Sequence, residues 1–526
     1  MVFLVYFILM VLDLQIYLQL LLIFLFISQL ILIPSLSKQA LAQGYDDPLN
    51  IQGLNHVTLQ SAASRAMGGT TLNLYNDAGV MFLNSASLQS LKGLQLSISG
   101  LQQFVSQKQV QQYTPLKYYS NFSLLMEGLT DLISNPDTSL HGTNPGDTVQ
   151  RAFDKIGPNW SYSRTKSLPI QVMLAMPFNI GESKFAIGIG SIEYANLEHY
   201  YRNNNVLSPA VGSVRPFPTD RPINDSTPVR TEWSAFERWR TGSIRGYGMA
   251  ISGSLSGKID LGVSGMMLEG STDDFEQSAS RGRLVFYKTW FRLEPRFKYL
   301  TRSGESKYSG YEFTFSGIYH AKYVNFGFMV KPPMTITRKY STNLEIDTLN
   351  YVATVPINGK DNITLPWRWT FGLSINLVQN LTLSMEYEVR PYASATYWKE
   401  GGEEILSSTY SDYPFPISSV VVKSKPWLSS SILHVGAAYE PSSWLVLRAG
   451  ARGQSEVFEP TGNAIIGEPV SYSIYSAGCG LTFSGLRLNL TYEYSMMKYI
   501  EMWQTNININ TEKRNNIIAD IVIQFP

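Results

Sequence analysis

Hydrophobic and polar positions alternate over most of this chain, most clearly near its C-terminal end. From Asn515 to Phe525, every second position is apolar; this set is Ile517, Ala519, Ile521, Ile523 and Phe525. The positions between them are mixed and include Asp520 and Gln524. A period of two is that of a β-strand, whose successive side chains point to opposite faces. A last strand of this kind that ends in an aromatic residue is typical of the strand that closes a membrane-spanning β-barrel, although here Pro526 follows the aromatic.

The same alternation recurs in pairs of segments joined by short turns. Residues 365–377 alternate Trp, Phe, Leu and Ile with Arg, Thr, Ser and Asn, and residues 380–391 repeat the pattern after a tight turn. The segments that fit a strand are 93–104, 168–178, 184–195, 244–256, 258–269, 284–300, 310–320, 323–332, 365–377, 380–391, 429–440, 443–453, 470–483, 485–497 and 514–525. Bacterial outer-membrane barrels have even strand numbers. We therefore predict about fourteen strands, with one segment of this set assigned wrongly.

The connections between these segments are of two kinds. Some are tight turns, whereas others are long, covering roughly residues 196–243, 335–364 and 392–428. Short turns at one rim and long loops at the other are typical of outer-membrane barrels. A β-sandwich would also alternate, but its strands are usually ~5–6 residues long, and those predicted here are longer, with Trp and Tyr near their ends. The predicted fold class is all-β, a transmembrane antiparallel β-barrel formed by residues 92–526.

Composition agrees with a barrel and excludes several other classes of protein. Of 526 residues, 16% are charged and 13% aromatic, with 31 Tyr and 10 Trp, against about 25% charged in ordinary soluble domains. A net charge of +1 gives no reason to expect a nucleic-acid partner. One cysteine and five scattered histidines predict neither a disulfide framework nor a metal site, and no cofactor is expected. The chain lacks the G-x-S-x-G, H-E-x-x-H and Walker motifs, so we do not expect an enzyme.

The first 42 residues differ from the rest. Residues 14–34 form a nearly unbroken apolar run, and Ala40-Leu41-Ala42 before Gln43 fits a signal-peptide cleavage site. We expect a signal peptide over residues 1–42. The alternative is an uncleaved helix, because the run is long enough to span a bilayer and no Lys or Arg precedes it. Met10 is an alternative start.

Residues 43–91 do not alternate and are rich in small side chains. They contain S-R-A-M-G-G-T-T-L-N-L-Y-N-D-A from Ser64 to Ala78, and then L-N-S-A-S-L from Leu83 to Leu88. These blocks resemble the start of the FadL-like outer-membrane transporters, including the PorV-type branch of Bacteroidetes-like bacteria, which reads R-A-x-G-x-G-G, D-D-A and N-P-A-G-L. The positions that carry the resemblance are Arg65, Ala66, Gly68, Gly69, Asn76, Asp77, Ala78, Asn84, Ala86 and Leu88. The chain departs from the pattern at Ser85, where the family has Pro, and at Ser87, where it has Gly, and it lacks one glycine of the first block.

The resemblance implies that residues 43–91 are a plug, or hatch, inside the barrel. Arg65 and Asp77 could then pair with charges of the wall, for which the candidates are Glu386, Glu388, Arg390, Arg448 and Arg452. The alternative is that the wall charges pair with one another and only fix the shape of the barrel. The alternation places His434 on the inward face of its strand.

Residues 121–157 interrupt the strand rhythm. Their apolar side chains recur at helical spacing, and the candidates for a greasy docking groove are Phe122, Leu125, Leu129, Leu132 and Phe153. An inserted helix pair here resembles the lid of the family, which would receive a hydrophobic ligand. The alternative is a capping helix that binds nothing. Trp160, Tyr162, Tyr200 and Tyr201 would add aromatic side chains to the mouth.

Two functions follow from the resemblance. The first is passive uptake of hydrophobic compounds, such as long-chain fatty acids, across the outer membrane of a Gram-negative bacterium, with the bilayer and a small hydrophobic ligand as partners. The second is a PorV-like scaffold that binds a secreted protein in a type IX secretion system. The apolar helices predicted at 121–157 favour uptake, whereas the polar lumen-facing positions favour a partner-binding barrel.

Overall fold

The computed structural model describes most of the chain beyond its N-terminal segment. The described residues are 52–112 (except 59, 73 and 75), 135–136, 159–208, 229–286 (except 256), 290–294, 298–400 (except 349 and 379), 427–460, 468–502 and 507–525. The predicted signal peptide, residues 1–42, lies outside them. So does the predicted helical insertion at 121–157, apart from residues 135–136.

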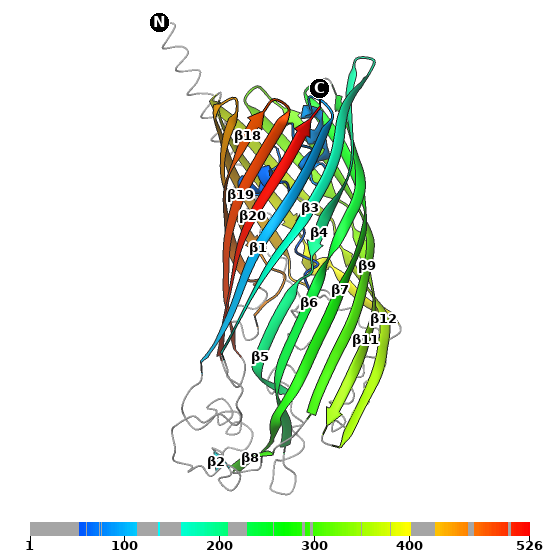
Figure 1. Cartoon of the computed structure of the whole chain (residues 1–526), viewed down its shortest axis with the longest axis vertical. Coiled ribbons are helices and arrows are strands. Elements are labelled where there is room, and N and C mark those ends of the chain that lie inside the picture. Colours follow the sequence, from blue (N-terminus) through cyan, green and yellow to red (C-terminus); the bar gives the residue numbers. More distant parts are fainter. Residues whose placement is uncertain are drawn as a thin grey trace. The chain divides into compact units, whose positions relative to one another are not determined.

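The wall is a closed ring of antiparallel strands (Figure 1). Its strands are β1 (Gln95–Gln112), β3 (Trp160–Ile180), β4 (Ser183–Asn196), β5 (His199–Ser208), β6 (Val229–Leu255), β7 (Ile259–Phe286), β9 (Lys298–His320), β10 (Val324–Lys331), β11 (Met334–Thr348), β12 (Tyr351–Leu365), β13 (Arg368–Val378), β14 (Leu381–Arg390), β15 (Thr396–Glu400), β16 (Ser430–Ser442), β17 (Leu445–Ser455), β18 (Ser471–Phe483), β19 (Leu486–Met502) and β20 (Ile507–Gln524). The ring closes where β20 pairs with β1 on one side and with β19 on the other. Two short strands, β2 (Asn135–Pro136) and β8 (Trp290–Glu294), pair with each other outside this ring order.

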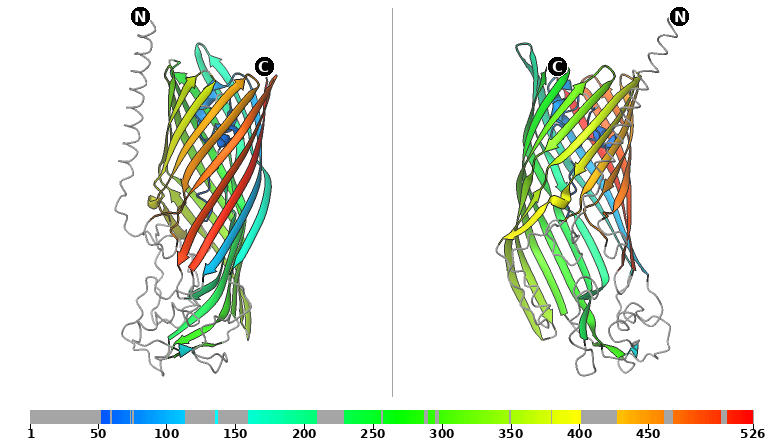
Figure 2. Two further views of the ribbon diagram at one scale, coloured as in Figure 1. Left: turned by 90° about the vertical axis from the view of Figure 1, so that its left-hand side faces the viewer. Right: turned by 180° about the vertical axis from the view of Figure 1, so that it is seen from behind.

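Four pairs of strands each form one interrupted pass across the wall: β4 with β5, β10 with β11, β12 with β13, and β14 with β15. The eighteen wall strands therefore make fourteen passes, which confirms the predicted fold class. The views in Figure 2 show the ring continuing around the sides that Figure 1 hides. Segment 284–300 is the one assigned wrongly, because it joins the end of β7 to the start of β9 and is no separate pass.

Strands extend further than the alternation predicted. Segment 335–364 is a hairpin of β11 and β12, whereas we had predicted a long loop. Segment 196–243 contains β5 and the first half of β6. Beyond the membrane, neither face of a strand meets lipid, so these extensions carry no apolar alternation to reveal them.

Two of the interruptions lie side by side and have a common cause. Lys331 is directly opposite Arg368, and Met334 is directly opposite Leu365, so Pro332-Pro333 faces Pro366-Trp367. Proline has no N–H to donate to a strand ladder. The wall is held here by the buried carboxylate of Glu312 on β9. It accepts hydrogen bonds from Lys331 Nζ at 2.5 Å, from Arg368 at 2.5 Å and from the Tyr194 hydroxyl at 2.7 Å.

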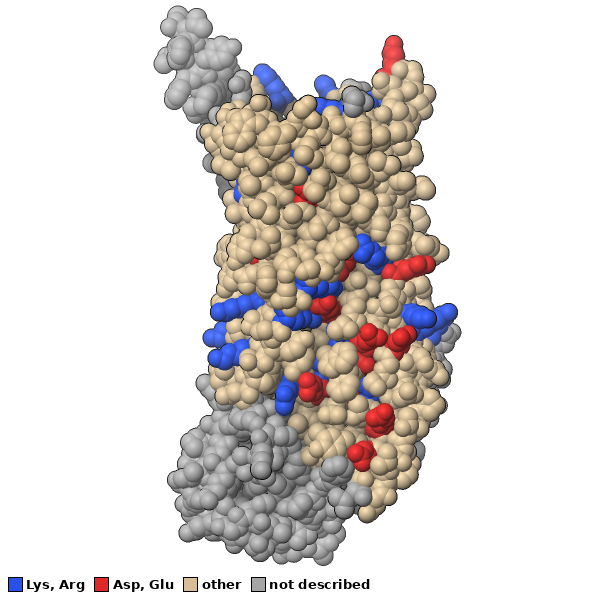
Figure 3. Space-filling model, in the orientation of Figure 1, with Lys and Arg blue, Asp and Glu red and all other residues tan. Residues whose placement is uncertain are grey.

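The outer face of the wall is apolar and the inner face is polar. Ile517 and Ile521 of β20 and the following Phe525 are exposed, whereas Ile518 and Asp520 of β20 are buried. Trp367, Trp369 and Phe371 are exposed in the same way. In Figure 3 a broad band of this outer surface is almost free of charged side chains. No helix among the described residues is long and apolar enough to cross a bilayer.

The barrel encloses residues 52–91, which we call the hatch segment. It contains one short helix, α2 (Ala62–Ala66), and two 3-10 turns, η1 (Ala78–Val80) and η2 (Ser85–Ser90). Its side chains and those of the inner wall form the largest apolar cluster, which includes Met81, Phe82 and Leu88 of the hatch segment. The chain then passes directly from the hatch segment into β1.

Candidate functional site

Carboxylates of the wall hold the backbone of the hatch segment. The Ala62 N–H, at the start of α2, donates to Asp520 Oδ2 of β20 at 2.6 Å. On the opposite side of the lumen, Glu386 of β14 accepts hydrogen bonds from the N–H groups of Thr71 and Leu72, the latter at 2.9 Å. A carboxylate at a helix N-terminus satisfies N–H groups that lack a partner within the helix. The hatch segment is thus anchored through its main chain as well as its side chains.

Arg65 forms the central ion pair between the hatch segment and the wall. Its guanidinium contacts Glu493 of β19, which also accepts from Arg452 Nη1 at 2.7 Å. Asn516 donates to the same carboxylate at 3.1 Å. Glu493 is 1% exposed and Arg65 4%, and breaking a buried pair by removing one partner costs about 3–5 kcal/mol. None of the predicted wall charges is the direct partner of Arg65. One of them, Arg452, binds the same carboxylate of Glu493 that Arg65 binds.

Two wall glycines let the hatch backbone lie directly against the wall. Gly436 and Gly450 are directly opposite each other on β16 and β17. A Cβ at Gly450 would lie 2.1 Å from the Gly68 nitrogen, and one at Gly436 would lie 2.3 Å from the Met67 oxygen. Gly68 itself has φ +68, a conformation that glycine adopts without strain. Sequence reasoning missed both wall glycines, because nothing in a strand pattern marks which glycine faces another segment.

The same region binds Gly68 by hydrogen bonds. Its N–H donates to Ser476 Oγ at 3.2 Å, and its carbonyl oxygen lies 2.7 Å from His434 Nδ1. His434 is 3% exposed, so the predicted inward orientation of this side chain is what the structure shows.

The other residues of the hatch motif make local turns and further wall contacts. Asn76 has φ 56 and is the one described non-glycine residue with positive φ; its side chain donates to Gln524 of β20 at 2.7 Å. Asp77 caps η1 and lies 3.9 Å from Arg487, which was not among its predicted partners. The Ala86 N–H donates to Ser316 of β9 at 2.9 Å.

Two residues of the motif form hydrogen bonds to other residues of the hatch segment. Asn84 donates to Thr71 at 3.3 Å, and Gly69, with φ +92, donates its N–H to the Ser64 oxygen at 2.8 Å.

The outer end of the hatch segment is tied to the loop between β17 and β18. Glu456 of this loop accepts from Asn55 at 2.9 Å and from the Tyr472 hydroxyl at 3.0 Å, and it lies 3.3 Å from His56 Nε2. Burial alone would raise the pKa of the Glu456 carboxyl, but the charge and hydrogen bond of His56, with Arg514 and Tyr472, lower it to about 2. This carboxylate therefore stays charged over a wide pH range and binds Asn55 and His56 at the outer end of the hatch segment throughout it.

Among the described residues, the first half of β3 has no backbone pairing with the third pass. Pairing of β3 with β4 ends at Gln171 and Ile192, and β5 pairs with β6 alone. The β4 strand is irregular between Glu193 and Ala195. At this point the hatch segment pairs with the free edge of β4. Val57 forms an isolated bridge with Ala195, and the Thr58 N–H donates to the Tyr194 oxygen at 3.0 Å. We call the region between residues 160–170 of β3 and the third pass the wall gap.

Side chains close the wall gap. The Tyr162 and Tyr200 rings stack at 3.9 Å, with Trp160 edge-on to Tyr200 at 5.4 Å. Nearer the hatch, Arg164 and Lys166 reach Glu198 at 2.9 and 3.0 Å. Trp160, Tyr162 and Tyr200, which we predict as aromatic side chains of the mouth, lie on β3 and β5 of the wall, and Tyr201 lies beside Phe236 instead. Closure by side chains needs only rotamer changes to open, whereas a paired strand would have to lose its ladder.

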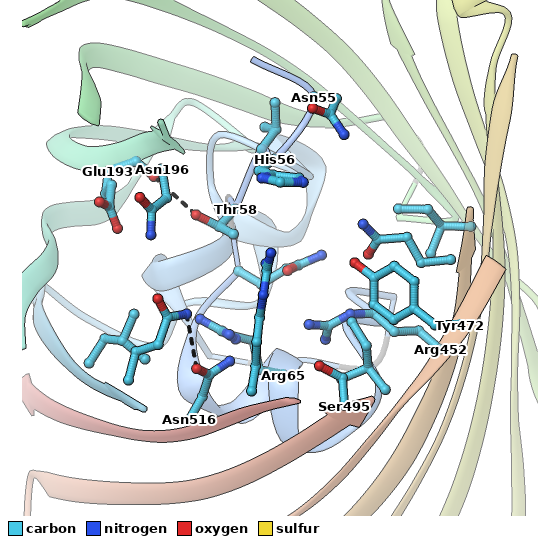
Figure 4. Close-up of a pocket in the computed structure, with 18 of the residues that line it drawn as sticks. Asn55, His56, Thr58, Arg65, Glu193, Asn196, Arg452, Tyr472, Ser495 and Asn516 are labelled. Atoms are coloured by element: carbon cyan, nitrogen blue, oxygen red, sulfur yellow. Dashed lines mark hydrogen bonds between the residues drawn. The ribbon is translucent and has the colours of Figure 1, made fainter. Parts of the chain in front are cut away.

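A cavity lies directly behind the wall gap and above the hatch segment (Figure 4). Its volume is about 90 Å³. Its gap-side lining includes Arg164, Glu193, Asn196 and Glu198, and its floor includes His56 and Arg65. The arginines that line it are Arg65, Arg164, Arg390, Arg452 and Arg514. The cavity is therefore polar, with apolar patches from side chains such as Leu101 and Ile432.

The predicted docking residues for a hydrophobic ligand lie outside the described residues; they are Phe122, Leu125, Leu129, Leu132 and Phe153. Within the described part of the chain, no group of three or more His, Cys, Asp and Glu side chains is placed to hold a metal ion.

No protein-family model and no curated protein sequence matches the chain. Solved structures do match. A FadL homologue from Pseudomonas aeruginosa is 12% identical with a TM-score of 0.55, covering 90% of this chain and 99% of that one. The chain has the FadL fold.

Other structures with the FadL fold are similar to this chain to the same degree. A TodX deltaS2S3 mutant, a monoaromatic hydrocarbon channel, is 12% identical with a TM-score of 0.54, covering 88% of this chain and 99% of its own. The monoaromatic hydrocarbon channel CymD is 11% identical with a TM-score of 0.51, covering 90% and 99%. The resemblance drawn from residues 64–88 thus holds for the fold, and the roles of residues here rest on the geometry of this chain.

Proposed function

We propose that this protein is an outer-membrane channel of a Gram-negative bacterium for the passive uptake of hydrophobic compounds. The observation that carries the proposal is the wall gap with the cavity behind it. A solute in the cavity is separated from the surrounding lipid by side chains alone. Two of the structures with the same fold are described as hydrocarbon channels, which supports a hydrophobic substrate.

The arginines that line the cavity bear on the head group that a substrate could carry. Five arginines line it, and a guanidinium binds a carboxylate through paired hydrogen bonds. Each of these arginines already pairs with a carboxylate of the protein: Arg65 and Arg452 with Glu493, Arg164 with Glu198, Arg390 with Glu388 and Arg514 with Glu512. A carboxylate head would compete with these pairs for the guanidinium groups, so the proposed substrates are hydrophobic compounds in general, and long-chain fatty acids are the example to be tested.

The hatch segment is proposed to block passage along the barrel axis. Its main chain and side chains contact β9, β14, β16, β18, β19 and β20, so its displacement would break many contacts at once. Leaving sideways through the wall gap breaks far fewer. The route proposed is from the mouth to the cavity and then through the wall gap into the membrane.

A partner-binding barrel of a secretion system was the alternative suggested by the polar lumen. The lumenal charges described above bind the hatch segment or one another, which accounts for their polarity without a protein partner. We therefore favour uptake.

Cross-linking the wall gap tests the route. Tyr162→Cys and Tyr200→Cys, in a chain with Cys479→Ser, place two thiols across the wall gap, where a short reducible bismaleimide can join them. We expect cross-linked cells to lose barrel-dependent uptake of a labelled long-chain fatty acid and to regain it on reduction. The control pair is Val172→Cys with Ser191→Cys, which are directly opposite in the paired part of β3 and β4, and it should transport normally. Unchanged uptake with the wall gap cross-linked would exclude this route.

The same assay tests the docking residues. We expect the Leu125→Asp/Leu129→Asp variant to lose uptake while its barrel still inserts, because two charges would oppose docking of an alkyl chain. Equal uptake in cells with and without the inserted barrel would exclude the transport function itself.

A further inference from the structure

The outer face of one side of the barrel carries an unusual set of charges. Strands β17, β18, β19, β20, β1 and β3 contain several charged residues, but most of them point into the lumen. The exposed, outward-facing ones are Lys108 of β1, Lys498 of β19 and Lys513 of β20. All three are basic, and none forms an ion pair with another described residue. In Figure 3, basic side chains gather below the uncharged band on this side of the barrel.

The three lysines lie close together on adjacent strands. Lys108 and Lys498 are both directly opposite Thr511 of β20, one on each side. Neighbouring strands are about 4.8 Å apart, so the two backbones are separated by about 10 Å. Lys513 is two residues along β20 from Thr511, at about 7 Å. Long, flexible side chains at these positions can converge on one group.

The cluster lies at the border of the apolar band. On β20 the exposed apolar positions end at Ile517, which follows Lys513 by four residues. On β1 they end at Phe104, four residues from Lys108, and on β19 Met496 precedes Lys498 by two. On β1 and β20 the strand thus passes from lipid-facing apolar side chains to lysine, whereas on β19 the exposed Ile500 follows Lys498.

This border belongs to the outer leaflet. It lies at the end of the strands away from the short turns, and in outer-membrane barrels the short turns are periplasmic.

The other side of the barrel balances its charges differently. Arg245 of β6 is directly opposite Glu269 of β7, so an acidic side chain of the wall faces the basic one. Like charges on adjacent strands destabilise a sheet, and among the described residues the lysine cluster has no acidic side chain on its own face to offset this repulsion. An anion from outside the chain would offset this repulsion.

We propose that Lys108, Lys498 and Lys513 bind the phosphate groups of an anionic, phosphorylated lipid in the outer leaflet. The charges are complementary, and the lysines sit at headgroup level while Phe104 and Met496 offer apolar contacts for acyl chains. Phosphate is bound well by ammonium groups, and a basic residue near a charged membrane surface adds about 1 kcal/mol. The proposal rests on the position of the barrel in the membrane and is independent of what the barrel transports.

The test is binding of bisphosphorylated lipid A to the purified full-length protein, measured by native mass spectrometry. We expect Lys108→Ser/Lys498→Ser/Lys513→Ser to bind about tenfold more weakly or worse, and the triple Lys→Arg variant to bind as the parent does. The control is Lys92→Ser/Lys258→Ser/Lys322→Ser, which removes the same charge from exposed positions at the short-turn rim. It should leave binding unchanged.

Two further ligands identify the group that is bound. Fully dephosphorylated lipid A should bind weakly to all variants, and inorganic phosphate should not displace the lipid. Equal binding by the two Lys→Ser triples, or equal binding of the dephosphorylated lipid to the parent, would refute the proposal. Displacement by inorganic phosphate would reduce the cluster to a simple anion site and would also refute it.

Discussion

Replacing Gly450 by alanine should loosen the hatch segment without harming the barrel. The added Cβ would lie 2.1 Å from the Gly68 nitrogen, whereas ordinary Cβ contacts begin at 3.4 Å. The two backbones must therefore separate by 1.3 Å, the difference between these distances. Such a shift breaks the hydrogen bonds of Gly68 to Ser476 and His434, which are 3.2 and 2.7 Å long.

The size of the effect follows from those two bonds. A hydrogen bond contributes about 1 kcal/mol, so the anchored state of the hatch segment should lose about 2 kcal/mol. That corresponds to roughly 30-fold faster exchange of the amide hydrogens around Gly68, if local release governs their exchange.

Hydrogen exchange followed by mass spectrometry measures this release directly. The matched control is Gly453→Ala on the same strand, because a Cβ there meets no atom within 4 Å. Alanine in place of glycine within a strand should stabilise it by roughly 0.5–1 kcal/mol, so the control should move in the opposite direction. Equal exchange of residues 67–72 in both variants, with both barrels folded, would refute the close approach of the hatch segment to the wall.

Two other predictions concern the hatch segment. Deleting residues 43–91 should raise single-channel conductance in planar bilayers strongly, and unchanged conductance would show that this segment does not close the barrel. The carboxyl of Glu456 has a pKa lowered from 4.5 to about 2, so its stabilising contribution is complete above pH 4.5 and is lost as pH falls toward 2. The difference in unfolding temperature between the parent and Glu456→Gln should therefore shrink from pH 5 to pH 2.5, and a constant difference would contradict the role of this carboxylate.

The sequence predicted the membrane-spanning part of the wall well. On β20 and on the hairpin of β13 and β14, lipid on one face and a polar lumen on the other impose alternation residue by residue, so the faces of Ile517, Asp520 and Trp369 could be read directly. The extensions of β7, β9 and β11 were missed because both faces meet polar surroundings there. The segment 284–300 was assigned as a pass of its own, whereas it holds the end of β7, the short β8 and the start of β9.

Contacts across the lumen could not be predicted in detail. Arg65 and Glu493 are 428 positions apart, and their meeting depends on how the hatch segment is placed and on the pairing register of every strand between. The charges of the hatch motif were identified, but Glu493 and Arg487 were not chosen as their partners. Glu386 was chosen as a wall charge, yet it binds main-chain N–H groups.

The pairing of β1 with β20 joins the first strand of the wall to the last, for example through Gln95 and Gln524. This large separation along the sequence adds little to the free-energy cost of pairing the two strands. The cost of closing a loop grows only by about 0.6 kcal/mol for each doubling of the loop length. The same separation has a larger effect on the rate of pairing, because contacts between residues far apart in sequence form slowly. The seam between these two strands is thus where assembly of the barrel is slowest, and an unclosed intermediate would present two bare strand edges, the form most prone to pair with another chain.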